Sequence, residues 1–220
     1  MKRLVMAPAV LAATMALVLA GCDSSGKQAG HEHHGTSEQE APQTTNNDVS
    51  SLNWRVPDFT FTDQGGKPFG LKDLKGKFWL ADFVFTRCPD VCPPMTANMA
   101  RVQEHLKKAG VSVEIVSFSV DPEYDTPERL TAFAEDHQAD LSTWHFLTGY
   151  KVEEIEKIAM EAFKGPVRQQ KSPSPEVPIL VTHPTQFYLI DDTGKVVRFY
   201  DGLKPDPDRI LEDVKQLTGK

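Results

Sequence analysis

Apolar residues between Leu52 and Lys220 fall into short runs and helical stripes. The run Phe-Trp-Leu-Ala-Asp-Phe-Val-Phe at 78–85 is interrupted only by Asp82, which predicts a strand buried on both faces. Residues 93–109 carry apolar side chains at helical spacing, and Gly110 follows as a terminator. We therefore expect a central strand followed by an amphipathic helix.

The remaining patterns continue the alternation of strands and helices. Strands are expected at 111–120, 144–147, 186–190 and 196–200, and helices at 126–136, 152–163 and 207–217. Thr126 is expected to cap its helix, with Pro127 at the first position. The last two strands form a hairpin. These elements predict an α/β fold with a mixed central sheet covered by helices on both faces.

One long segment, from Phe163 to Gln186, has no periodic pattern and contains five prolines. A loop of about 20 residues inside a compact domain is usually either functional or disordered. Because the segment ends at His183, we expect it to be functional.

The first 21 residues have the pattern of an export signal. Lys2 and Arg3 precede an almost wholly apolar stretch that ends in Leu-Ala-Gly-Cys at 19–22, as in a secretory signal peptide. This ending resembles the lipobox of bacterial lipoproteins, in which the cysteine is acylated and becomes the first mature residue. We expect residues 1–21 to be removed and Cys22 to anchor the protein to the cell membrane, on its extracytoplasmic face. The alternative is a plain membrane-spanning anchor, since about 17 apolar residues are at the short end of a span.

Residues 22–51 have the composition of a linker. They are rich in Ser, Gly, Gln, Thr and Asn and lack an apolar period, so they are expected to form a flexible tether. The sequence His-Glu-His-His at 31–34 could bind a transition metal weakly, although a plain polar linker is the simpler interpretation. Residues 52–220 are then expected to form one domain with a single core.

The composition excludes several classes of protein. Lys and Arg number 24 against 31 Asp and Glu, which gives a formal net charge of −7. No basic field is therefore available to bind nucleic acid. Three cysteines in 220 residues are too few for a disulfide scaffold. We expect no nucleic-acid partner.

The reactive side chains are concentrated in Thr-Arg-Cys-Pro-Asp-Val-Cys-Pro-Pro at 86–94. Cys88 and Cys92 are four residues apart at the start of the predicted helix, so both sulfurs are expected on one helix face. They can form a disulfide or bind one metal ion. Cys88 is expected at the helix mouth, where free N–H groups favour a thiolate. A purely structural disulfide is the simpler alternative in an exported protein, but a bridge closing so few residues constrains the unfolded chain little.

Three segments together resemble the Sco/SenC family, whose members include bacterial lipoproteins. They are the strand-Cys-x-x-x-Cys-Pro-helix unit, Ser-Val-Asp-Pro at 119–122, and Val-Thr-His at 181–183 before Phe-Tyr-Leu-Ile-Asp at 187–191. The resemblance implies a thioredoxin-like fold with an N-terminal extension. It also implies a copper chaperone that assists assembly of the binuclear CuA centre in subunit II of cytochrome c oxidase.

The resemblance assigns roles to individual residues. Cys88, Cys92 and His183 would be the copper ligands, and Asp121 would support the site. Asp82 stands six residues before Cys88, the spacing of the buried acid of thioredoxin. Its pKa should be raised in an apolar strand, which would serve proton transfer, or it is simply hydrogen-bonded in place.

The proposed ligand types agree with copper chemistry. Two soft thiolates suit Cu(I), and an added imidazole also allows Cu(II). Zinc competes for the same ligands, but a structural zinc site normally has four of them.

A second function stays open, so whether the chain is an enzyme is undecided. A thiol–disulfide oxidoreductase would use Cys88 and Cys92 as its redox disulfide, reduce the copper-binding cysteines of subunit II, and depend on a thiol reductant protein. His183 favours the chaperone, because a dithiol reductase does not need this ligand. A peroxiredoxin-like peroxidase is disfavoured, since Phe85 stands three residues before Cys88, where that family carries threonine.

Overall fold

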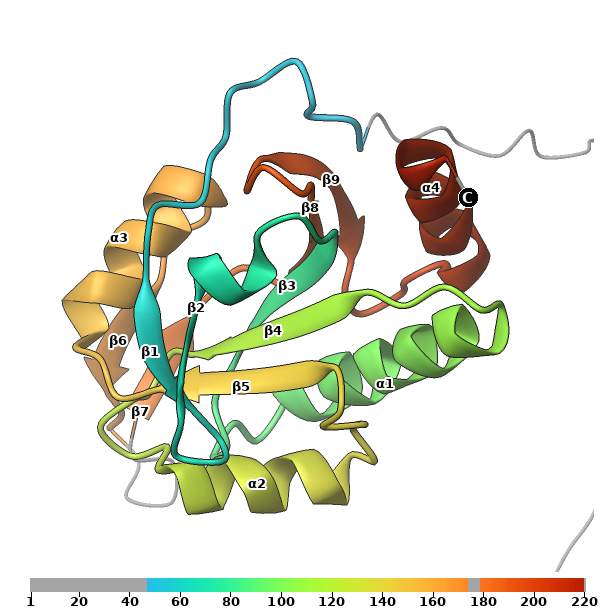
Figure 1. The fold of residues 1–220 in the computed structure, drawn as a ribbon. Helices are drawn as coiled ribbons and strands as arrows, with labels where there is room; N and C mark the ends of the chain where they lie inside the picture. The colour runs from blue at the N-terminus through green and yellow to red at the C-terminus, as the bar shows by residue number, and fades with distance from the viewer. Residues whose placement is uncertain (1–46, 174–178, 220) are drawn as a thin grey trace, which may run out of the picture. The chain divides into compact units, whose positions relative to one another are not determined.

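The computed structural model describes residues 47–173 and 179–219 (Figure 1). The predicted signal sequence, Cys22 and the histidine-rich segment 31–34 lie outside the described residues. The main sheet has seven strands in the order β2-β1-β5-β4-β3-β8-β9. Its strands are β1 (Thr60–Asp63), β2 (Pro68–Gly70), β3 (Trp79–Val84), β4 (Glu114–Ser119), β5 (Trp144–Thr148), β8 (Gln186–Ile190) and β9 (Val196–Asp201).

Within the described part of the chain, four α-helices accompany the sheet, together with a short 3-10 helix at Leu71–Leu74. The α-helices are α1 (Cys92–Lys108), α2 (Pro127–Asp136), α3 (Val152–Ala162) and α4 (Pro207–Thr218). Alternation along β3 separates the layers, because neighbouring strand residues point to opposite faces. Phe83 meets the ring of Phe163, directly after α3, whereas Asp82 lies on the face of Cys92 at the start of α1. The predicted α/β fold with helices on both faces is confirmed.

The strand and helix positions agree with the sequence analysis within a few residues. Thr126 caps α2 by accepting the backbone N–H of Arg129 at 3.4 Å, as predicted. β1 and β2 were not predicted; they are short, and β2 begins with a proline at the edge of the sheet. Because a three-residue strand is too short to establish an apolar alternation, no sequence signal marked it.

The segment between Phe163 and Gln186 is not a loop without secondary structure. It contains an antiparallel pair of its own, β6 (Arg168–Lys171) and β7 (Ile179–Thr182), which form a separate two-stranded sheet. The prediction of an irregular segment was therefore wrong. β6 (Arg-Gln-Gln-Lys) has no apolar position from which periodicity could be recognised, and β7 (Ile-Leu-Val-Thr) is apolar but only four residues long and directly follows Pro178.

Residues 47–51, assigned to the tether from composition, lie against β9. The Val49 N–H donates to the carbonyl of Val197 at 3.1 Å, and the Phe199 N–H donates to the carbonyl of Asn47 at 3.2 Å. Val49 is 5% exposed, and Asp48 pairs with Arg198 at 2.7 Å. The packed chain therefore begins upstream of the expected start at Leu52.

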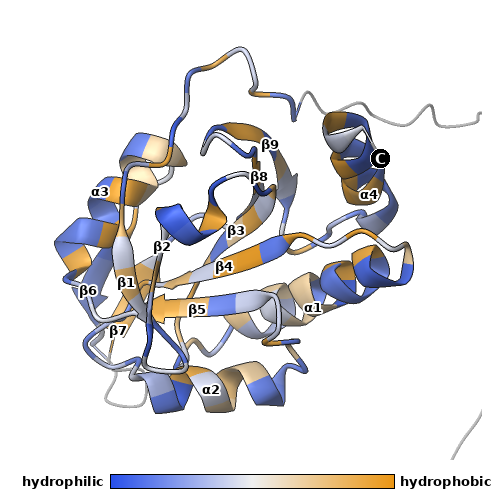
Figure 2. Cartoon of the chain, in the orientation of Figure 1, coloured by the Kyte–Doolittle hydropathy of each residue, from blue (hydrophilic) through white to orange (hydrophobic). Residues whose placement is uncertain are grey.

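The apolar residues concentrate on the strands and on the inward sides of the helices (Figure 2). β3 is buried at every position, as expected for a central strand. The helix α1 turns Met95, Met99 and Val102 into this core. Among the residues that the structure describes, no helix is long and apolar enough to cross a membrane.

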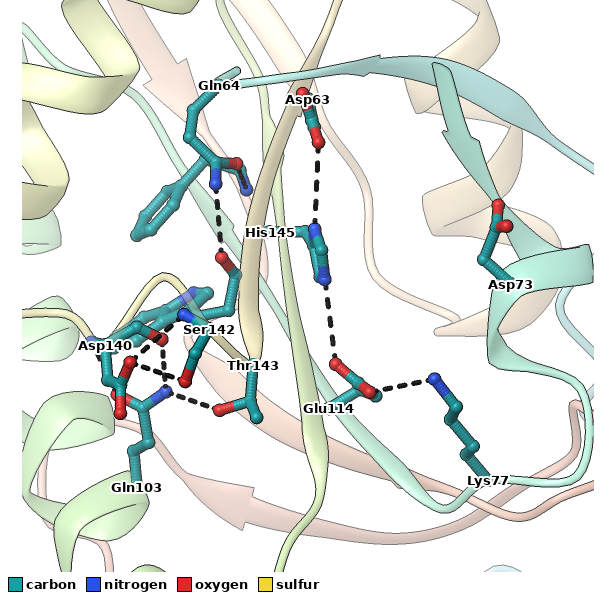
Figure 3. A network of polar contacts seen from close by, with 12 residues as sticks. Asp63, Gln64, Asp73, Lys77, Gln103, Glu114, Asp140, Ser142, Thr143 and His145 are labelled. Atoms are coloured by element: carbon teal, nitrogen blue, oxygen red, sulfur yellow. Dashed lines mark hydrogen bonds and ion pairs between the residues drawn. The ribbon is translucent and has the colours of Figure 1, made fainter. Parts of the chain in front are cut away.

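A polar network ties the edge strands to the sheet (Figure 3). His145 on β5 lies between two carboxylates, with Nδ1 3.9 Å from Asp63 of β1 and Nε2 3.6 Å from Glu114 of β4. Phe69 of β2 stacks on the imidazole with ring centroids 3.8 Å apart. Lys77 adds an ion pair to Glu114 at 2.9 Å. His145 thus has a structural role in attaching the β1–β2 pair.

Candidate metal and thiol site

The strand order brings two segments that are distant in sequence to the same end of the sheet's central strands. β3 and β8 are antiparallel neighbours, with Ala81 opposite Tyr188. The end of β3 therefore lies beside the beginning of β8. Cys88 and Cys92 follow the first of these strand ends, and His183 precedes the second.

The helix starts at Cys92, so Cys88 is not on the helix face as the sequence analysis expected. Cys88 lies in the preceding turn, where its N–H donates to the carbonyl of Phe85 at 3.2 Å. The Cys92 N–H donates to Sγ of Cys88 at 3.4 Å. Pro93 and Pro94 explain the shift, because prolines are favoured at the first positions of a helix. The prediction that Cys88 lies at the helix mouth is confirmed.

Both cysteines are free thiols in this structure, and their acidities differ. A hydrogen bond with Cys92 lowers the pKa of Cys88 to about 4, with further help from His183 and from backbone N–H groups. The same hydrogen bond with Cys88, together with burial, raises the pKa of Cys92 well above its usual value. Cys88 is therefore the thiolate of the pair and Cys92 the protonated thiol.

His183 reaches the cysteines from 91 residues further along the chain. Its Nε2 lies 3.5 Å from Sγ of Cys92, and the edge of its ring meets Phe85, with ring centroids 6.0 Å apart. Nδ1 lies 2.9 Å from the carbonyl oxygen of Pro184. Because a carbonyl only accepts, Nδ1 carries the proton, and in the neutral ring Nε2 keeps its lone pair.

Asp82 lies buried beneath this group. The Ser117 hydroxyl donates to Oδ1 of Asp82 at 2.5 Å and itself accepts from Nε1 of Trp144 at 2.8 Å. Oδ2 has no partner among the described residues. Burial raises the pKa of Asp82 to about 7, although the Ser117 hydrogen bond and the nearby His183 oppose the rise. A carboxyl that is half protonated near neutral pH agrees with the sequence prediction of a raised pKa.

Asp121 lies at the same end of the sheet but is held by an ion pair. Nε of Arg87 lies 2.5 Å from Oδ2 of Asp121, and the Arg87 guanidinium stacks over Tyr124 at 4.2 Å. This contact connects the cysteine turn to the loop after β4. Arg87 was not expected as a partner of Asp121, because the two residues are 34 positions apart in the sequence.

Asp125 was also missed. Its carboxylate accepts from the Thr86 N–H at 3.2 Å, from the Thr86 hydroxyl at 2.6 Å and from the Ser119 hydroxyl at 2.6 Å. Burial raises the pKa of Asp125. The side chain thus anchors the residue two before Cys88 to the end of β4. In the sequence, only the position of Asp125 shortly after the Ser-Val-Asp-Pro segment could have indicated that it lies near the site.

Metal binding requires some rearrangement of the candidate ligands. Within residues 47–173 and 179–219, no three His, Cys, Asp or Glu side chains form a group that could hold a metal ion as it stands. Cys88 and His183 are 9% and 8% exposed, and Cys92 is fully buried. The three candidate ligands are adjacent, but an ion has to enter between side chains that now contact each other.

The fold and the site define a thioredoxin-like protein with a thiolate–thiol pair and an adjacent histidine. The model of the SCO1/SenC family matches residues 49–219. The chain therefore belongs to the SCO1/SenC family.

Several relatives of the chain are informative. The SCO1 protein homolog of Bacillus subtilis is 46% identical over 168 residues, which are 76% of this chain and 84% of the relative. The solved structure of a SCO1/SenC family lipoprotein from Bacillus anthracis is 48% identical, with a TM-score of 0.70 over 76% of this chain and 96% of that one.

Two further solved structures carry functional information about the proteins they contain. BsSco has a disulfide switch and is a member of the Sco family of cytochrome c oxidase assembly proteins. It is 45% identical with a TM-score of 0.67, over 74% of this chain and 93% of that one. Bradyrhizobium japonicum ScoI, solved with copper bound, is 28% identical with a TM-score of 0.62, over 74% of this chain and 98% of that one.

Proposed function

We propose that this protein is a copper chaperone that binds copper through Cys88, Cys92 and His183. The observation that carries the proposal is the 3.5 Å approach of His183 Nε2 to Cys92 Sγ across 91 residues of sequence. A dithiol alone has no need of this imidazole. The copper-bound relative ScoI and the assembly function of BsSco support the same conclusion.

The ligand chemistry allows both oxidation states of copper. The thiolate of Cys88 is available near neutral pH because its pKa is low. Cys92 must lose its proton when copper binds, as a ligating cysteine does. Two thiolates suit Cu(I), and the His183 nitrogen adds the ligand type that Cu(II) prefers.

The proposed recipient is subunit II of cytochrome c oxidase, where the ion would enter the CuA centre. Cys88 is 9% exposed, but Pro89 and Asp90 beside it are exposed, so this is the side from which a partner's thiolates would approach the ion. A site with three protein ligands leaves a position open for the recipient. Acylation of Cys22 would hold the domain at the extracytoplasmic face of the cell membrane, which agrees with the lipoprotein described from Bacillus anthracis.

The thiol acidities also support a second function, reduction of a partner disulfide. The Cys88 thiolate would attack one partner sulfur, forming a mixed disulfide and releasing the other partner sulfur as a thiolate. Cys92, after losing its proton, would then attack Cys88 and release the second partner thiol. The products are a Cys88–Cys92 disulfide and a reduced partner, and a thiol reductant protein would restore the dithiol.

One experiment tests copper binding and the role of the thiols together. Protein purified without oxygen would be analysed for copper and for free thiols in the same sample, before and after oxidation to the disulfide. We expect tight Cu(I) uptake at one ion per chain by the dithiol form and loss of tight uptake by the disulfide form. Equal uptake by both forms would remove the two cysteines from the site.

A further inference from the structure

Two glycines from distant parts of the chain lie against the residues that follow His183. A Cβ placed on Gly165 would lie 2.3 Å from Cγ of Pro184, and a Cβ on Gly202 would lie 2.4 Å from the carbonyl oxygen of Thr185. Neither glycine has a positive φ. Both positions therefore require glycine for space, because any side chain there would displace the segment that carries His183.

Hydrogen bonds connect this segment to the helix that begins at Cys92. Asn98 of α1 is 3% exposed and donates from Nδ2 to the carbonyl of Gly202 at 2.7 Å and to that of Leu203 at 2.9 Å. The Gly202 N–H donates to the carbonyl of Thr185 at 2.9 Å. Cys92 and the segment after His183 are thus linked through Asn98 and Gly202.

The orientation of the Asn98 amide is itself fixed. Arg101, one turn further along α1, donates to Oδ1 of Asn98. Nδ2 is thereby turned toward the two carbonyls that it reaches. A buried amide with every polar atom paired holds its neighbours in one arrangement.

We propose that Gly165, Gly202 and Asn98 are positioning residues that set the His183 imidazole at the distance and angle at which its Nε2 can join Cys92 in binding copper. The Pro184 carbonyl accepts a hydrogen bond from the Nδ1–H of His183, and this leaves the Nε2 lone pair directed toward the thiol of Cys92. The two glycines hold that carbonyl in place, and Asn98 fixes it relative to α1. The role of this arrangement in copper binding rests on the proposed function, whereas the contacts that hold His183 are independent of it.

Binding of Cu(II) is the first test, because Cu(II) depends on the imidazole more than Cu(I) does. Partners that orient a metal-ligating histidine are commonly worth about 10–100-fold in affinity. We expect Gly165→Ala and Asn98→Ala each to weaken Cu(II) binding within that range and to shift the thiolate charge-transfer absorption. Binding of Cu(I) should change much less.

A matched control separates positioning from general destabilisation. Gly70 on β2 is equally crowded, since a Cβ there would lie 2.2 Å from the carbonyl oxygen of Phe59, but it lies at the far edge of the sheet. Gly70→Ala should lower the melting temperature yet leave Cu(II) affinity and absorption unchanged. If Gly70→Ala weakens Cu(II) as much as Gly165→Ala does, the proposal is wrong.

Two combined variants sharpen the comparison. Replacing Pro184 by Ala removes the ring atom that the new Cβ would strike, so Gly165→Ala with Pro184→Ala should regain part of the lost Cu(II) affinity. In a His183→Ala background, Asn98→Ala should cause no additional loss, because the side chain that it positions is absent. A full additional loss there would overturn the proposal, and this comparison also stands if a glycine variant fails to fold.

A measurement without copper keeps the proposal separate from the proposed function. In the reduced apoprotein, nitrogen NMR should detect the His183 proton on Nδ1, and Asn98→Ala or Gly165→Ala should redistribute it between the two ring nitrogens. If the wild-type ring shows the single Nδ1 form but no copper binds, the proposed function fails and the positioning stands. If the variants keep the wild-type nitrogen signals, the positioning fails.

Discussion

The Nε2 atom of His183 lies 3.5 Å from Sγ of Cys92. The contact exists because β3 and β8 pair antiparallel at the centre of the sheet, so the end of one strand adjoins the start of the other. Each residue is anchored separately, Cys92 by the first turn of α1 and His183 by the packing after β7. The pair is therefore a product of the tertiary fold rather than of local sequence.

Replacing His183 by Ala should distinguish a chaperone from a reductase. Two thiolates remain, so Cu(I) should still bind, though more weakly, whereas Cu(II) should lose most of its affinity and its thiolate colour. The dithiol potential should move little. In cells, cytochrome oxidase activity should fall and added copper should partly restore it.

His137→Ala is the matched control for that variant, because His137 is a half-buried residue at the end of α2 whose ring contacts Phe133 of the same helix and lies outside the candidate site. It should leave copper binding unchanged. Normal oxidase assembly in the His183→Ala strain, with loss only for Cys88→Ser or Cys92→Ser, would favour the reductase.

Cys88 should react selectively with iodoacetamide. With a pKa of about 4, its thiolate is fully formed at pH 6, and the rate should be nearly constant from pH 6 to 8. Cys92→Ala removes the thiol donor that contributes most to this shift, so the rate at pH 6 should fall by at least about 10-fold. Mass spectrometry of the modified peptide gives the site, and preferential labelling of Cys92 would contradict the assignment.

The free energy of unfolding should decrease as pH rises, because of Asp82. Its pKa is raised by burial from 3.8 to about 7, so the folded protein holds this proton more tightly than the unfolded chain does. As pH rises from about 4 to about 7, the unfolded state ionises first and gains relative stability. The free energy of unfolding of the wild type should fall relative to that of Asp82→Asn, by up to about 4 kcal/mol at pH 8.

Urea unfolding of both proteins at pH 5 and pH 8 measures this difference. The comparison with Asp82→Asn cancels the titration of all other groups. A difference that is the same at both pH values would mean that Asp82 ionises normally in the folded protein.

Removal of residues 47–51 should lower the stability of the domain without affecting copper binding. A protein that starts at Leu52 loses the buried Val49 side chain and the ion pair of Asp48 with Arg198. We expect its free energy of unfolding to fall by about 1–3 kcal/mol compared with a protein that starts at Asn47. Both should bind one copper ion, and loss of copper from both would indicate that the tether histidines form the site.

Strong periodicity accounts for what the sequence predicted well. The run at 78–85 is apolar except for Asp82 and predicts a buried strand, and the apolar stripe at 93–109 predicts the helix α1. The Thr126-Pro127 pair marks the start of α2 directly. β6 and β7 were missed because their pairing depends on the tertiary position of the segment rather than on an apolar pattern.

The residues of the candidate site also fall into a predictable group and an unpredictable one. The cysteines and His183 carry recognisable chemistry, so their residue types and the family resemblance were enough to name them. The contacts of Arg87 with Asp121 and of Asp125 with Thr86 join segments 34 and 39 residues apart. No local pattern encodes such distances, and the structure was needed to find them.

The pairing of residues 47–49 with β9 has a consequence for solubility. β9 is the last strand of the seven-stranded sheet, and an open edge is a template for pairing with another chain. Asn47 and Val49 bond to the backbone of β9 and so occupy part of that edge. These two residues therefore also hinder a second copy of the protein from pairing its own sheet with this edge.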